Sequence, residues 1–88
     1  MRTGKISSGF EFAIEESALD NMELVDALAE IDEGNTLQIS NACTMLLGKA
    51  QKKKLYDHLR TKEGNVPAGE FTRALLEIFE KLNDGKNS

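Results

Sequence analysis

The chain has 88 residues, a formal net charge of −4 and a single cysteine. A chain of this length buries only about 60% of the surface it exposes when unfolded, so we expect one small domain over residues 1–88. One cysteine excludes a disulfide framework, and no apolar run approaches the roughly 18 residues of a membrane span. The first residues also lack the apolar core of a signal peptide, which favours a soluble, cytoplasmic protein.

The first predicted element is a short strand near residues 9–15. Phe10, Phe12 and Ile14 alternate there with smaller or acidic residues, and this period of two is typical of a half-buried strand. No second run of comparable quality follows, and residues 1–8 are expected to be flexible. The strand must therefore pair with a poorly marked segment, lie on helices, or join another copy of the chain.

A first helix is predicted near residues 18–31. Leu24, Leu28 and Ile31 recur at i, i+4 and i+7, which gives the segment an apolar stripe. Either Ser17 or Asp20 fits the first position of a capping box, because each is followed three residues later by an acidic residue. The run from Asp32 to Asn35 ends the helix.

Two further helices are predicted near residues 38–47 and 50–61, separated by Gly48. The earlier one carries Ile39 and Leu46 on one face and is apolar nearly all round, so we expect it to be the most buried element. Gly48 fits a left-handed cap at its end. The later helix begins with lysines, which oppose the helix dipole and are therefore expected to serve a charge partner.

A fourth helix is predicted near residues 67–82, with Pro67 at its first position. Residues 83–88 form a polar tail that is expected to be flexible. The pattern as a whole predicts a mainly α fold, a small four-helix domain with one short N-terminal β-strand. The expected core comprises Phe12, Leu24, Leu28, Ile39, Leu46, Leu55, Leu59, Phe71, Leu75 and Ile78.

Charge is strongly segregated along the chain. Residues 11–33 contain nine acidic residues and no basic one, whereas residues 49–62 contain six basic residues against Asp57 alone. These blocks are either two solvated helix faces or a contact between neighbouring copies. With the unpaired strand, they lead us to expect a homo-oligomer that high salt weakens.

The residues that could carry chemistry are few. Cys43 lies in an apolar stripe and is expected to be a core residue, while His58 is expected at the surface near a helix end. No metal-ligand spacing and no glycine-rich phosphate loop occur, so we expect no enzyme, no cofactor and no metal. The lysine cluster is too short, in too acidic a chain, to predict nucleic-acid binding.

One alternative concerns Ser17. The run from Ser17 to Leu28 resembles the start of the second helix of acyl carrier proteins, in which a serine receives phosphopantetheine. The chain departs from that pattern, because Glu16 replaces the aspartate and Ala18 separates the serine from Leu19. Only 16 residues precede the serine, and they have a strand pattern where carrier proteins have a helix.

Taken whole, residues 10–80 resemble the small tail assembly chaperones of long-tailed bacteriophages and prophages. The resemblance rests on several short runs rather than on a catalytic motif. These are the Phe/Ile strand, LDNMELVDALAE over residues 19–30, TMLLG over 44–48, QKKKLYDHLR over 51–60 and EGNVP over 63–67, followed by an amphipathic helix with Ile78.

The resemblance implies a non-enzymatic protein that holds the long tape measure protein in the bacterial host cell while the tail tube assembles. The tape measure protein is then the expected partner, and the tail tube protein a second candidate. We expect the partner-binding residues to be Lys52, Lys53, Lys54, Tyr56, Leu76 and Phe79, from surface chemistry alone. Burial of Leu76 and Phe79 against the N-terminal strand is the alternative.

Overall fold

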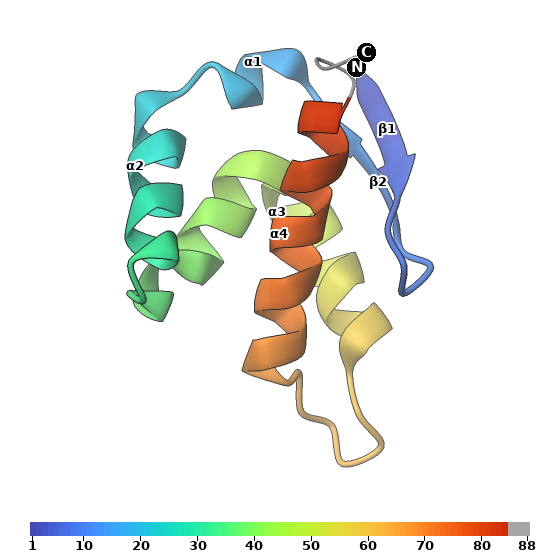
Figure 1. Cartoon of the computed structure of the whole chain (residues 1–88). Coiled ribbons are helices and arrows are strands. Elements are labelled where there is room, and N and C mark those ends of the chain that lie inside the picture. The colour runs from blue at the N-terminus through green and yellow to red at the C-terminus, as the bar shows by residue number, and fades with distance from the viewer. Residues whose placement is uncertain (85–88) are drawn as a thin grey trace.

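A computed structural model describes residues 1–84 of the chain, and for Asn83 and Asp84 it describes the backbone only. A two-stranded antiparallel sheet of β1 (Arg2–Lys5) and β2 (Glu11–Ile14) precedes the helices. They are α1 (Glu16–Leu19), α2 (Met22–Asp32), the 3-10 turn η1 (Thr36–Gln38), α3 (Ile39–Leu59) and α4 (Ala68–Asp84). Figure 1 shows α2 on one side, the hairpin on the other, and α3 and α4 between them. The predicted mainly α class is confirmed.

The N-terminal strand pairs within the chain with a poorly marked segment, which is one of the three expected alternatives. Residues 1–8, for which no strand was predicted, contain β1. β1 pairs with β2 in a register that places Gly4 opposite Phe12. A Cβ atom on Gly4 would lie 2.6 Å from the Phe12 ring, so glycine allows this aromatic side chain to pack close to the strand. The pairing partner was poorly marked because RTGK lacks alternating apolar residues.

Three side chains fasten the hairpin to the helices. Gln51 of α3 accepts a hydrogen bond from the Ala13 amide (2.8 Å) and donates one to the Ala13 carbonyl (2.5 Å). Arg2 donates to the carbonyl of Leu82 in α4 (2.6 Å). At the turn, Glu77 of α4 accepts bonds from the Ser7 amide (2.6 Å) and the Ser7 hydroxyl (2.8 Å). The hairpin therefore joins both long helices.

The predicted helix over residues 18–31 is in fact two helices. α1 ends at Leu19, and α2 starts anew at Asn21, whose side chain accepts a hydrogen bond from the Glu23 amide (2.9 Å). The cap is therefore Asn21, and the predicted capping boxes at Ser17 and Asp20 were wrong. Asparagine is as good a cap as aspartate, so sequence pattern alone does not choose between them.

The two middle helices are separated at Gly48, as predicted, and α3 is the name of both halves, which meet at a kink there. Gly48 has φ 80° and ψ 163°, a backbone conformation that is essentially restricted to glycine. Gln51 also donates a hydrogen bond to the Leu47 carbonyl (2.9 Å), across the turn. The fourth helix begins at Ala68, directly after Pro67, and extends to Asp84. Asn83 and Asp84 thus belong to a helix rather than to a tail, and residues 85–88 of the predicted tail lie outside the described residues.

The core lies between the inner face of the hairpin and the helices. Seven of the predicted core residues are buried, but Leu28, Ile39 and Leu59 are only partly buried. Among the described residues, no helix is both long enough and apolar enough to cross a membrane. The buried apolar residues are Ile6, Phe10, Phe12, Ile14, Leu24, Ala27, Ile31, Ala42, Cys43, Leu46, Leu47, Leu55, Phe71, Ala74, Leu75, Ile78 and Leu82.

Replacing Gly48 by alanine should destabilise the protein by about 1–3 kcal/mol, because alanine is strained at this φ and ψ even though open space surrounds the site. Gly69 is the matched control, since it is a helical glycine that also faces open space. Gly69→Ala should instead stabilise by about 0.4–1 kcal/mol. Urea denaturation of the two variants measures both changes, and equal effects would contradict the assigned strain.

The Glu77 contact should make stability depend on pH. Hydrogen bonds from the Ser7 amide and then its hydroxyl hold the pKa of Glu77 below its usual value of 4.5. Because this pKa is lowered by folding, the stabilisation is complete above the usual value and is lost as the pH falls through the lowered one. Glu77→Gln should therefore be less stable than the parent at pH 7 and should match it in strong acid. Glu80→Gln, on the same helix, is the control. In urea denaturation, its difference in stability from the parent should not change in this way between pH 7 and strong acid.

Candidate protein-binding site

An apolar groove lies where the two halves of α3 meet the start of α4. Its cavity measures about 280 Å³, and most of its lining is apolar. Tyr56 and Phe71 meet edge to face at its base, with ring centroids 5.1 Å apart. The lining residues are Ile39, Ser40, Tyr56, Val66, Ala68 and Phe71.

Lys52 places a positive charge at this groove. Its ammonium donates hydrogen bonds to the hydroxyls of Ser40 (2.6 Å) and Thr44 (2.9 Å) and lies 5.7 Å from the centre of the Tyr56 ring. The side chain is half-buried, and no carboxylate lies within ion-pair distance of it in the described part of the chain. The charge thus has polar and aromatic neighbours without a counterion, which suits it to receive a carboxylate from a partner.

The turn at Gly48 is what brings these groups together. Ser40 and Lys52 are 12 residues apart, and a straight helix would separate them by about 18 Å along its axis. A lysine side chain cannot span that distance. Because α3 turns at Gly48, its earlier half presents Ser40 and Thr44 to the side chains of its later half.

An exposed leucine lies close in sequence to a residue that lines the groove. Leu37, in η1, is 89% exposed, the largest exposure among the large apolar residues described. It stands two residues before Ile39, which lines the groove. The other strongly exposed apolar side chains lie at the N-terminus and on α2 and α4, and they are Met1, Met22, Val25 and Leu76.

The six residues predicted to bind a partner lie at different places in the structure. Tyr56 lines the groove, and Lys52 does not line it but contacts two of its residues, Ser40 and Tyr56. Lys53 is exposed and lies 3.5 Å from Asp57 one helical turn later, while Lys54 borders a hollow on the outer face of the hairpin. These two lysines do not line the groove.

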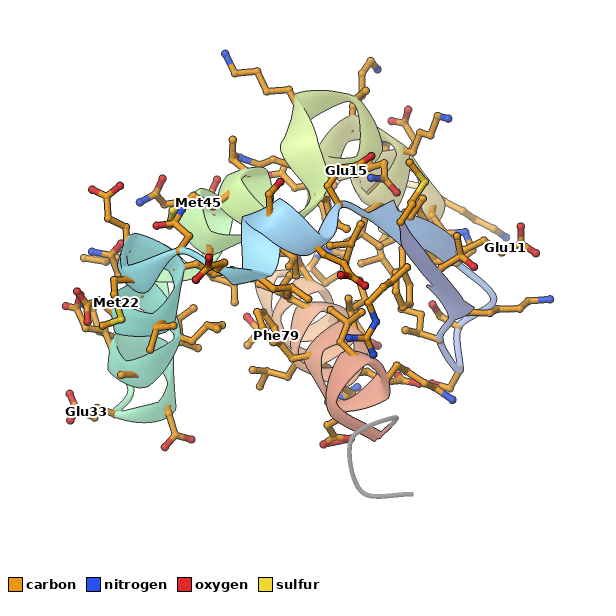
Figure 2. All side chains as sticks on the ribbon, turned by 90° about the horizontal axis from the view of Figure 1, so that it is seen from above. Glu11, Glu15, Met22, Glu33, Met45 and Phe79 are labelled. Atoms are coloured by element: carbon orange, nitrogen blue, oxygen red, sulfur yellow. The ribbon has the colours of Figure 1, made fainter. Side chains whose placement is uncertain are left out.

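The predicted residues of α4 lie elsewhere. Leu76 is 42% exposed and borders a shallow hollow with charged neighbours, including Arg73 and Glu80. Phe79 is half-buried and packs on the core, and Figure 2 shows it between α4 and the side of the molecule that carries α2. Neither residue lines the groove.

Sequence reasoning missed most of the groove. Ile39 and Phe71 were assigned to the core, and Leu37, Val66 and Ala68 were given no role in partner binding. The spacing of Ser40 and Thr44 at i and i+4 does place two hydroxyls on one helix face, but it does not reveal that Lys52 reaches them. Only the turn at Gly48 shows that.

The residues with reactive side chains are spread over the fold. Cys43 is completely buried, and burial raises the pKa of its thiol to about 11, although the positive charge of Lys52 acts in the opposite direction. His58 is exposed, with Nε2 3.0 Å from the Ser8 carbonyl and its ring against Phe10. Residues 1–82 contain no group of three or more His, Cys, Asp or Glu side chains that could hold a metal ion.

Ser17, the residue of the carrier-protein alternative, is exposed in the four-residue helix α1. A β-hairpin precedes it, where a carrier protein has a full helix. Comparisons of the chain with family models, with curated proteins and with solved structures find no match.

Cys43 should react with thiol reagents very slowly in the folded protein. With a pKa near 11, only about one thiol in a thousand is ionised at pH 8, and burial also blocks access. We expect labelling at pH 8 to be at least about 100-fold slower in the native protein than in urea. Mass spectrometry over time measures both rates, and equal rates would show that Cys43 is accessible.

Proposed function

We propose that this protein is a non-enzymatic assembly chaperone that binds an amphipathic helix of a longer protein. The observation that supports the proposal best is the apolar groove with the uncompensated ammonium of Lys52 at its side. A groove of this kind takes up apolar side chains that recur on one face of a helix. The charge then orients the helix and favours one that carries a carboxylate.

The chemistry of the groove defines the segment that it fits. Half-buried Tyr56 offers aromatic surface to the apolar face of a bound helix, and its ring is supported by the buried ring of Phe71. Lys52 has three neutral neighbours, so an aspartate or glutamate of the partner would supply a counterion for its ammonium group. A carboxylate placed one or two turns from an apolar anchor therefore fits better than a lysine, which Lys52 would repel.

The proposed partner is a tape measure protein, and the proposed location is the cytoplasm of a bacterial host cell. This part rests on the resemblance of residues 10–80 to small tail assembly chaperones, and it includes the tail tube protein as a second candidate partner. Tape measure proteins are long and rich in helices, so they offer many amphipathic segments that need cover before the tube forms. A groove for one acidic amphipathic segment supports such a role.

Co-expression with the tape measure protein tests the proposal. The wild-type chain should raise the soluble fraction of the partner, and Ala68→Glu should remove most of that gain, because Ala68 is exposed and lines the groove, so the new charge would repel acidic segments. Leu76→Glu is the matched control, since it places the same charge at another exposed residue of α4, away from the groove. It should rescue the partner as well as the wild type does.

Two results would overturn the proposal. Equal solubility of the partner with and without this protein would exclude the chaperone function. Loss of rescue by Leu76→Glu, with Ala68→Glu fully active, would place the binding surface around Leu76 on α4 instead. Circular dichroism of each variant controls for folding.

A further inference from the structure

The outer face of α2 has the chemistry that the groove is suited to bind. Met22 is 68% exposed and Val25 is 47% exposed, and with exposed Ala29 they form one stripe at i, i+3 and i+7. Asp26 and Glu33 follow Met22 and Ala29 by four residues, so carboxylates border the stripe. α2 is thus an acidic helix with an unpartnered apolar stripe.

The described residues of the same chain leave this stripe uncovered. The opposite face of α2 carries Leu24, Ala27 and Ile31, which are buried, and it packs against α3. Figure 2 shows Met22 and Glu33 on the side of α2 that points away from the rest of the molecule. Among the described residues, the stripe is therefore open to a surface of another molecule.

We propose that α2 of a second copy occupies the groove when the partner helix is absent, so that self-association and partner binding exclude each other. The proposal rests on the proposed function, because it assigns the same groove to both helices. Charge complementarity selects this occupant. Residues 11–33 have nine carboxylates and no basic residue, and Lys52 at the groove has no carboxylate partner in the described chain.

The interface joins two different surfaces, the α2 stripe of one copy and the groove of the next. Such a head-to-tail contact produces an open chain of copies, or a ring where the rotation closes. The contact is small, because α2 is only about 16 Å long, so it should be weak and readily displaced by a longer partner. It should also weaken at about 1 M salt, where the screening length falls to roughly 3 Å.

Two sets of substitutions separate the two surfaces. Met22→Glu with Val25→Glu removes the stripe and leaves the groove intact, whereas Ala68→Glu places a charge in the lining of the groove and leaves the stripe intact. In sedimentation velocity, the wild-type mass should rise with concentration, and each variant alone should sediment with the mass of one chain, 9.7 kDa. Leu76→Glu is again the matched control and should associate like the wild type.

Mixing the two variants gives the sharpest test. Each retains one half of the contact, so an equimolar mixture should form a species with the mass of two chains and nothing larger. A mixture that stays at one chain, or variants that associate like the wild type, would overturn this interface. A wild type that stays monomeric at all concentrations would also overturn it, while leaving the proposed function to the co-expression result.

The stripe variant also distinguishes this inference from the proposed function. As a monomer with an open groove, Met22→Glu with Val25→Glu should solubilise the tape measure protein at least as well as the wild type. A monomeric stripe variant that fails to rescue the partner would contradict partner binding in the groove and leave the self-association intact. Addition of the soluble partner segment to the wild type should dissociate the oligomer into complexes that contain one copy of this chain each. An oligomer that persists with the partner bound would show that the two interactions do not exclude each other.

Discussion

The conformation of Gly48 is the constraint on which most of this structure depends. At φ 80° and ψ 163°, the backbone leaves the helical region, so the two halves of α3 run in different directions. The buried side chains on both sides of the turn, Leu46, Leu47 and Leu55, then belong to one core. The same turn brings Ser40 and Thr44 to Lys52, which a straight helix would keep apart.

The hairpin holds this turned helix against α4. Gln51 bonds both the amide and the carbonyl of Ala13, and it also reaches Leu47 across the turn. In α4, Glu77 accepts hydrogen bonds from Ser7, and the carbonyl of Leu82 accepts one from Arg2. The hairpin thus contributes apolar residues to the core and polar contacts that join α3 to α4. Figure 1 shows its position beside the helices.

The distribution of charge supports the proposed binding of a partner helix. The carboxylates of α2 are on the surface, while Lys52 is half-buried with hydroxyl and aromatic neighbours. Partial burial weakens the screening of Lys52 by solvent, so an incoming carboxylate gains more there than at a fully exposed lysine such as Lys53. In the proposed function, this half-buried charge would therefore favour an acidic helix over others of similar hydrophobicity.

The sequence by itself determined the features that depend on local pattern. The apolar spacing of Phe71, Leu75 and Ile78 predicted α4 and its buried face, and Gly48 marked the break in α3, because periodicity and backbone preference belong to neighbouring residues. Only the tertiary structure decided the pairing of β1 with β2, the partial burial of Leu28 and Ile39, and the meeting of Lys52 with Ser40. Strand pairing relies on backbone hydrogen bonds that a polar segment such as RTGK makes as well as an apolar one. The groove depends on the direction in which α3 continues after Gly48, and that direction is set by packing between residues far apart in the chain.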